Sequence, residues 1–161
     1  MSEAATAPDL DGLCAQLARM PAFLDAALER AGAGRVATRP AAGGFSLLEH
    51  ACHLRDLERE GYLLRILRLL AEERPVLEGF DGERVARERD YASQDAREAA
   101  GEFAAARAEV LRVVRGLDRE ALAREGEFAG GRITLAGVVA MAAAHDAGHR
   151  AEIDGLVAEL G

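Results

Sequence analysis

The chain has 161 residues and a formal net charge of −8, and half of its residues are hydrophobic while only 4% are aromatic. Such a length suits one domain that buries its own core, and the hydrophobic content excludes a disordered chain. The acidic charge and the scarcity of aromatic rings argue against a nucleic-acid-binding protein, which needs basic surfaces and stacking platforms. We therefore expect a single domain at residues 9–161, preceded by a flexible tail at residues 1–8.

The first two predicted helices occupy the N-terminal half of the chain. Apolar residues recur every three or four positions over residues 9–31, which predicts a helix that Pro21 kinks or splits. A second helix starts after Ser46, because Ser46 and Glu49 have the spacing of a capping box. Its leucine pattern fades before Pro75, where a loop is expected.

A charged segment, a third helix and a short turn are predicted next along the chain. Residues 83–90 form a run of charges, which we interpret as a solvated segment. A third helix is predicted at about residues 94–114, and Asp118 can cap a short turn after it. These connections are long, so crossovers between helices are possible as well as simple hairpins.

The C-terminal part predicts a fourth helix at about residues 135–160, with Thr134 as its N-cap. Gly126, Gly130 and Gly131 precede it and are interpreted as a flexible approach. No segment shows convincing strand alternation. The predicted fold class is therefore all-α, a four-helix bundle with long connections.

The N-terminal sequence, the length of the most apolar stretch and the number of cysteines predict where the protein is located and whether its thiols are reduced. The N-terminus is acidic and lacks the apolar run of a signal peptide. The most apolar stretch, residues 133–144, is shorter than the roughly 20 residues of a bilayer span. We expect a cytoplasmic protein with no membrane partner, in which Cys14 and Cys52 are reduced core thiols.

The four histidines carry the strongest chemical signal. His145 and His149 are one helical turn apart on the apolar stripe of the last helix, so their imidazoles face the same way. His50 and His53 lie on the second helix, and either can supply a third ligand from a facing helix. Three imidazoles suit Zn, Ni or Fe and leave positions for water or substrate. Two other interpretations stay open: a structural site with a fourth ligand, or hydrogen-bonded core histidines without an ion.

Acidic residues near these histidines are candidates for supporting roles. Asp56 and Glu60 follow His53 by three and seven residues, roughly on its face, so either can act as a general base or hydrogen-bond a ligand. Asp146 lies about 100° around the helix from His145. It can orient a neighbouring group but cannot easily share the ion. All three can equally be solvated helix acids.

Two arginines and one cysteine complete the set of candidates. Arg65 and Arg107 can hold an anionic substrate, and salt bridges explain them equally well. Cys52 is adjacent to His53 and therefore points about 100° away from it, which argues against a ligand or nucleophile. The chain contains no lysine, so catalytic-lysine chemistry is excluded.

Two segments resemble known motifs. Residues 39–54, R-P-A-A-G-G-F-S-L-L-E-H-A-C-H-L, are similar to the pattern R-P-x-x-G-x-W-S-x-x-E-x-x-x-H-L of DinB-like (DinB/YfiT) proteins, with Phe45 in place of the usual Trp. G-R-I-T-L at residues 131–135 and H-D-A-G-H at residues 145–149 resemble that family's G-x-x-T-L and H-D-x-x-H. The resemblance extends over about residues 9–160.

This resemblance implies a ligand set. In DinB-like proteins a four-helix bundle holds one divalent ion, typically Zn or Ni, through three histidines. The matching positions here are His53, His145 and His149. The family pattern passes over His50, which is then a neighbour of the site or a surface residue.

The resemblance also implies a range of activities. Members of the family include transferases that use a low-molecular-weight thiol such as bacillithiol, mycothiol or glutathione, and metal-dependent hydrolases, and homodimers are common. We expect a metal-dependent enzyme acting on a small molecule, in the first place a thiol-dependent S-transferase and a homodimer. The alternatives are a metal-dependent hydrolase and a non-catalytic metal-binding or stress-response bundle.

Overall fold

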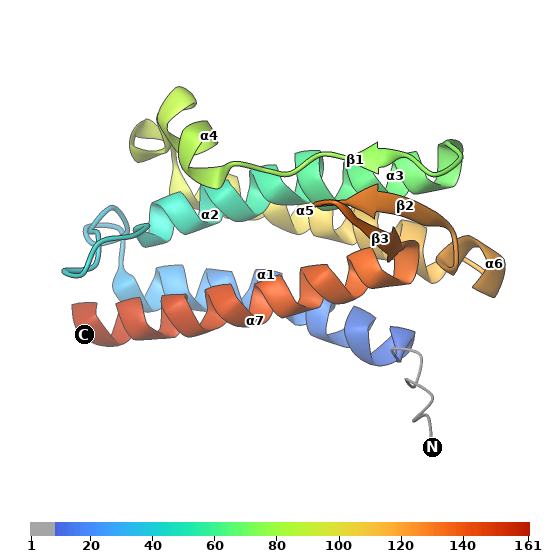
Figure 1. Cartoon of the computed structure of the whole chain (residues 1–161). Coiled ribbons are helices and arrows are strands. Elements are labelled where there is room, and N and C mark those ends of the chain that lie inside the picture. The colour runs from blue at the N-terminus through green and yellow to red at the C-terminus, as the bar shows by residue number, and fades with distance from the viewer. Residues whose placement is uncertain (1–8) are drawn as a thin grey trace, which may run out of the picture.

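Four long helical segments dominate the computed structural model, which describes residues 9–161 (Figure 1). They are α1 (Leu10–Ala31), the uninterrupted run of α2 (Leu47–Leu57), η1 (Glu58–Leu63) and α3 (Leu64–Ala71), then α5 (Ala96–Arg115) and α7 (Leu135–Leu160). α5 packs against α1 and α2, and α1 also packs against α7. The predicted four-helix bundle is confirmed, while the predicted tail lies outside the described residues.

The first helix runs unbroken through its internal proline. Pro21 has no N–H to donate to the carbonyl of Leu17, four residues earlier. The Nη1 of Arg107, on α5, donates to this carbonyl instead, at 2.8 Å. A split at Pro21 is therefore not found, because a side chain from a neighbouring helix replaces the missing bond.

The second helix begins as predicted but contains a wide turn that the sequence does not reveal. The side chain of Ser46 accepts from the Glu49 backbone N–H, and the Glu49 side chain accepts from Ser46 in return. Further along, η1 is a π-helical turn between two α-helical stretches. A π turn rotates the following residues relative to an ideal α-helix. The side-chain directions that α-helical spacing predicts from α2 are therefore incorrect beyond residue 58.

A small sheet lies beside the bundle, contrary to the prediction of no strands. It contains β1 (Val76–Leu77), β2 (Glu125–Phe128) and β3 (Gly131–Thr134). β2 pairs in parallel with β1 and antiparallel with β3. Strands of two to four residues are too short to show alternation, which is why the pattern missed them.

The glycines before α7 build this sheet and are not a flexible approach. Ala129 and Gly130 form the two-residue turn between β2 and β3, with φ angles of 51° and 79°. Positive φ at both positions is typical of a type I′ hairpin turn, which glycine favours. Gly126 is buried, and a Cβ there would lie 2.7 Å from the Pro75 carbonyl oxygen. Only glycine allows that approach.

The charged run at residues 83–90 is solvated as predicted, since all its charged residues are exposed, and most of it is helical. α4 (Gly82–Glu88) is capped by Asp81, whose side chain accepts from the Arg84 backbone N–H at 3.1 Å. Val85 is buried against the bundle. The segment is therefore capped at its start and held against the bundle by Val85.

The remaining elements are short, and the predicted caps are confirmed. They are η2 (Tyr91–Ser93) and α6 (Arg119–Leu122). Asp118 caps α6 through the Ala121 backbone N–H, and Thr134 caps α7 through the Gly137 backbone N–H. The hairpin therefore delivers the chain directly into the helix that carries two of the histidines.

Two apolar clusters fill the bundle, one towards each end. One includes Met20, Leu24, Phe103 and Ile153, and the other Leu17, Val110, Val138 and Ala142. Between them lies a layer of buried polar side chains: His50, His53, Glu58, Arg107, Asp146 and His149. The candidate site is thus at mid-length of the bundle, where α2 and η1 face α5 and α7.

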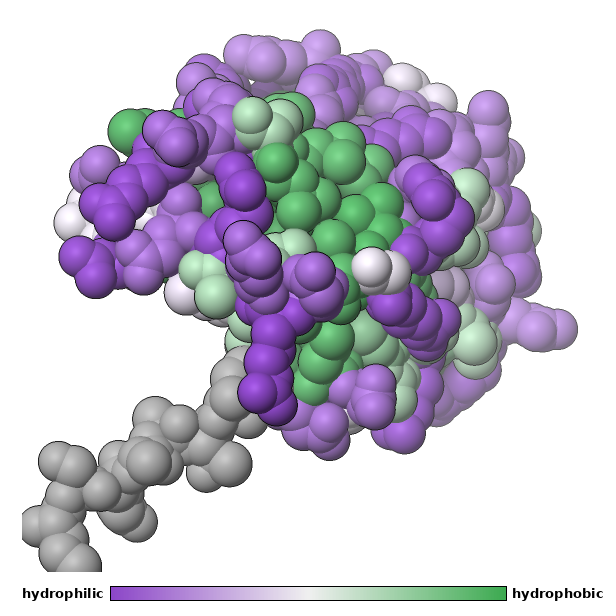
Figure 2. Space-filling view, turned by 90° about the vertical axis from the view of Figure 1, so that its right-hand side faces the viewer, coloured by the Kyte–Doolittle hydropathy of each residue, from purple (hydrophilic) through white to green (hydrophobic). Residues whose placement is uncertain are grey.

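The surface shows where apolar groups reach solvent. At the end of the molecule near α6, a group of hydrophobic residues is exposed and is surrounded by hydrophilic residues (Figure 2). Within residues 9–161, no helix is long and apolar enough to cross a membrane. The structure is that of one chain, so the homodimer stays a prediction, as does the cytoplasmic location.

Candidate metal centre

Three histidines from two helices meet in the polar layer. His53 comes from α2, and His145 and His149 come from successive turns of α7. The ring centroids of His145 and His149 are 4.4 Å apart, and those of His53 and His149 are 4.9 Å apart. One nitrogen from each ring lies within 4.8 Å of the others. The structure therefore brings together the three residues that the sequence singled out.

Burial keeps these imidazoles neutral, as a ligand must be. Desolvation by burial, together with the neighbouring histidines, lowers the pKa of His53 to about 4 and that of His149 to about 3. The pKa of His145 is also lowered, mainly by burial. At neutral pH all three rings therefore offer a lone pair.

The donor set fits a divalent transition-metal ion. The Nδ1 of His53 is buried and has no hydrogen-bond partner among the described residues. Buried polar atoms are nearly always paired, so an orphaned imidazole nitrogen inside a cluster of imidazoles indicates a missing partner. Three imidazoles suit Zn, Ni or Fe.

The fourth histidine, His50, is buried beside the other three, so of the two expected positions it is a neighbour of the site and not a surface residue. Its Nδ1 lies 3.1 Å from the Nδ1 of His149. This contact leaves Nε2 as the nitrogen of His149 that can bind an ion. The Nε2 of His50 lies 3.7 Å from a carboxylate oxygen of Glu152. His50 is therefore the outer partner of a candidate ligand.

Aromatic rings surround the cluster. The ring of Phe45 lies 5.4 Å from that of His53, and the ring of Phe80 lies 6.0 Å from it. Tyr62 packs edge-on against His145 at 6.2 Å. These three rings therefore pack directly against two of the candidate ligands, His53 and His145.

Gly82, the first residue of α4, approaches His53 so closely that no side chain fits. A Cβ at this position would lie 2.7 Å from Cε1 and 2.8 Å from Nδ1 of His53. The start of α4 thus fixes one edge of the candidate ligand.

Replacing Gly82 by alanine is expected to displace the His53 ring and weaken Zn²⁺ binding by about tenfold or more, because misplacing a site group by about 1 Å is costly. Chelator competition measures the affinity. Gly79→Ala is the matched control, since a Cβ there meets nothing within 4 Å. Equal affinities of the two variants would contradict the role assigned to Gly82.

The structure does not bring Asp56 or Glu60 into the cluster. Asp56 binds Tyr91 Oη at 2.6 Å and Arg55 Nε at 2.8 Å. Burial opposes ionisation, but these bonds still lower the pKa of Asp56. Glu60 lies on the π turn, where it is exposed and holds Arg89 through two bonds of 2.6 and 2.7 Å. Their assignment as catalytic residues stays a prediction, without support from the geometry.

Asp146 is buried and binds an arginine rather than a histidine. Arg107 donates to Asp146 at 2.6 and 3.0 Å and to Glu58 at 2.8 and 2.9 Å. Burial alone would lower the pKa of the Arg107 guanidinium, but these bonds raise it, so it stays charged. Burial raises the pKa of Glu58, against the opposing effect of Arg107. Of the two roles considered for Arg107, the salt bridge between helices is the one found.

Glu58 is the member of this network that the sequence analysis missed. It continues the apolar stripe of Leu47, Ala51 and Leu54 at spacings of three and four residues. Arg107 interrupts the stripe of α5 in the same way. An acid and a base on the buried stripes of two helices are a signal for a buried ion pair.

Cys52 lies away from the cluster, as predicted. Its Sγ faces Gln94 Oε1 at 3.6 Å, and burial raises the pKa of its thiol to about 11. Cys14 and Cys52 are both buried free thiols.

Fold and site together define the class: a helical bundle with a three-histidine candidate metal centre between facing helices. The sequence model of the DinB superfamily matches residues 16–153, and the chain belongs to this superfamily. A comparison with curated proteins found no match.

A solved structure shares the architecture. It is YfiT from Bacillus subtilis, described as a probable metal-dependent hydrolase with an unusual four-helix bundle topology. The TM-score is 0.88 at 21% sequence identity, and the alignment covers 100% of this chain and 93% of YfiT. At this identity the likeness shows the fold.

Proposed function

We propose that this protein is a metal-dependent enzyme that acts on a small molecule through one divalent ion held by His53, His145 and His149, and that its reaction is a hydrolysis. The observation that carries the proposal is the convergence of three neutral imidazoles within 4.8 Å. Three protein ligands leave positions for other molecules, as catalytic sites do and closed structural sites do not. The description of YfiT as a probable metal-dependent hydrolase supports the same reaction class.

The protein's own residues would supply the rest of the site. A bound ion lowers the pKa of a water molecule or a thiol that it binds. His50 would fix the orientation of His149 through the contact between their Nδ1 atoms. Phe45, Phe80 and Tyr62 would exclude bulk water from the histidines.

A thiol-dependent S-transferase is the second candidate reaction, and it rests on the family resemblance. The same centre would serve it, because a metal ion activates a thiol as it activates water. Cys52 is no substitute for a small thiol, since its Sγ lies against Gln94. A screen of ester and amide hydrolysis, and of transfer with and without glutathione, bacillithiol or mycothiol, separates the two reactions.

Elemental analysis of untagged protein is the decisive experiment. We expect about one equivalent of Zn, Ni or Fe, lost in His149→Ala with the fold retained. Asp154→Ala is the control, since Asp154 is an exposed residue of the same helix. Absence of metal in the wild-type protein, with a melting temperature unchanged by added Zn²⁺ or Ni²⁺, would contradict the proposal. Metal without any activity in the screen would favour the non-catalytic bundle.

A further inference from the structure

Arg65 is a buried cation that has no counter-ion among the described residues. It lies on α3, with 6% of its surface exposed. Among residues 9–161 no carboxylate forms an ion pair with it, in contrast to Arg107. Its Nε donates to the Glu78 carbonyl at 3.3 Å. Burial lowers the pKa of Arg65, but a guanidinium stays protonated at neutral pH. An uncompensated buried charge is costly, so it indicates an anionic partner.

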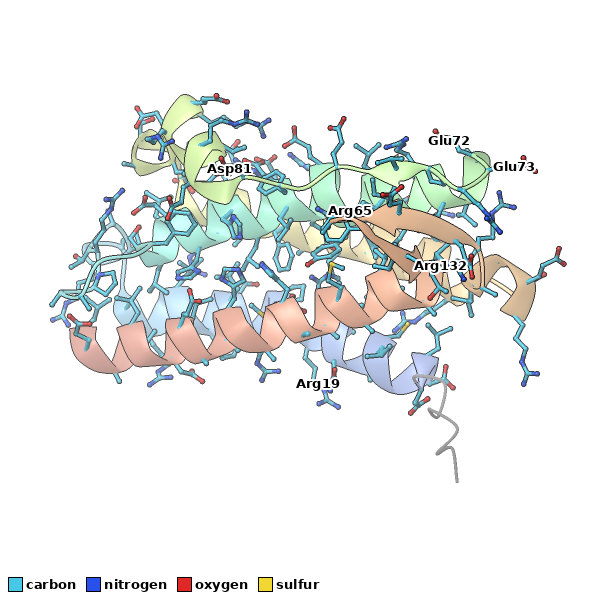
Figure 3. All side chains as sticks on the ribbon, in the orientation of Figure 1. Arg19, Arg65, Glu72, Glu73, Asp81 and Arg132 are labelled. Carbon is cyan, nitrogen blue, oxygen red and sulfur yellow. The ribbon has the colours of Figure 1, made fainter. Side chains whose placement is uncertain are left out.

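The guanidinium is held in place by two aromatic rings. Its Cζ lies 4.7 Å from the ring centre of Phe128, on β2, and 5.4 Å from that of Tyr62, on η1. These contacts and the bond to Glu78 hold the group, which lies between α3 and the end of the small sheet (Figure 3).

Arg65 lines a pocket of about 320 Å³ that also contains three other arginines. Each of these three has an acidic partner: Arg68 pairs with Glu72, Arg84 with Glu88, and Arg89 with Glu60. Among the arginines of this pocket, within the part of the chain that the structure describes, Arg65 alone has no such partner. Glu60, Glu78, Asp81 and Glu88 also line the pocket, so its walls carry both charges, and Arg65 is the cation in it that no ion pair of the described residues neutralises.

The pocket adjoins the candidate metal centre. Phe80 lines the pocket and packs against His53. Tyr62 lies between Arg65 and His145, in contact with both. A molecule anchored at Arg65 would therefore lie beside Phe80, one of the aromatic residues that pack on the candidate metal ligands.

We propose that Arg65 anchors a carboxylate group of a small-molecule substrate. With Nε bound to Glu78, the two terminal nitrogens form the remaining edge of the guanidinium, and two parallel N–H groups match the two oxygens of a carboxylate. One unpaired positive charge balances one negative charge, which favours a monoanionic carboxylate over a phosphate dianion. The claim that the anchored molecule is a substrate rests on the proposed metal centre. The claim that Arg65 binds a carboxylate does not depend on it.

Calorimetric titration of the zinc-loaded protein with acetate, and separately with inorganic phosphate, tests this assignment. We expect acetate to bind more tightly than phosphate, and Arg65→Met to weaken acetate binding by about tenfold or more, as loss of hydrogen bonds to a charged group implies. Arg68→Met is the matched control, one turn along α3 and lining the same pocket, and should leave acetate affinity unchanged. Arg65→Gln, which keeps a donor for the Glu78 carbonyl, should show the same loss if Arg65→Met does not fold.

The outcomes separate this inference from the proposed function. Acetate affinity that is unchanged in the Arg65 variants, a wild-type protein that binds neither anion, or a preference for phosphate would overturn the carboxylate assignment. Zinc content measured in the same samples reports on the metal centre independently. A wild-type protein without zinc contradicts the proposed enzyme, whereas a zinc-loaded protein with Arg65-independent acetate binding contradicts only this inference.

Discussion

Replacing Arg107 by methionine is expected to lower the free energy of unfolding by about 3–5 kcal/mol, the usual cost of removing one partner from a buried ion pair. The exposed fractions of Glu58 and Asp146 are only 1% and 4%, so both carboxylates would be left in the core without a cation. The Leu17 carbonyl would also lose its donor. Urea unfolding in the presence of EDTA measures the effect without a contribution from metal binding.

Two further variants show whether the loss comes from unpaired charge. In the triple variant Glu58→Leu/Arg107→Met/Asp146→Leu most of the stability should return, because hydrophobic replacement of a whole buried ionic group is often neutral or stabilising. Arg112→Met breaks only the exposed pair with Glu109 and should cost at most about 1 kcal/mol. A loss in Arg107→Met no larger than in Arg112→Met would contradict the interpretation.

Replacing His50 by alanine is expected to weaken Zn²⁺ binding by about 10–100-fold without removing a ligand, as loss of an outer partner of a metal-binding histidine typically does. The reason is the 3.1 Å contact between the Nδ1 atoms of His50 and His149. If His149 donates this proton, its Nε2 carries the lone pair for the ion. Without His50, the ring can rotate or change tautomer. Competition with a chromogenic chelator measures the affinity.

Glu152→Gln provides the control for His50. Glu152 approaches His50 at 3.7 Å, but 65% of its side chain is exposed, so its replacement should change zinc affinity far less. His50→Gln keeps a side-chain oxygen that can accept from His149 and should recover part of the affinity. If His50→Ala bound zinc as tightly as the wild-type protein, His50 would be a packing residue without influence on the site.

Helical periodicity predicts that His145 and His149 share a face, whereas the choice of His53 over His50 as the third candidate ligand came from the family resemblance. The i, i+4 spacing of His145 and His149 and the capping box at Ser46 are local features, and both appear in the structure. His50 was harder to place, because α2 is buried on all sides and a helical position alone does not say which neighbour a side chain meets.

Other features depended on contacts that no local pattern encodes. Glu60 was expected on the face of His53, but the π turn at η1 rotates it to the surface. Arg65 and Arg107 look alike in the sequence, and only the folded chain shows that Arg107 pairs with carboxylates while Arg65 pairs with none within residues 9–161. The β2–β3 hairpin depends on pairing with β1, from a distant part of the chain.

The proline of α1 has a consequence for how the helices align. A bundle whose stripes are built from leucine and alanine can slide by one turn, about 5.4 Å, and still bury apolar surface. Pro21 leaves one carbonyl of α1 without its helical partner, and a single buried guanidinium, that of Arg107, meets it. In a slid arrangement both groups would be unpaired in the core, at a cost of about 1–3 kcal/mol for the carbonyl alone. Pro21, which would weaken an isolated helix, thus makes misaligned arrangements of the bundle less stable. It thereby keeps Glu58 and Asp146 level with the histidines.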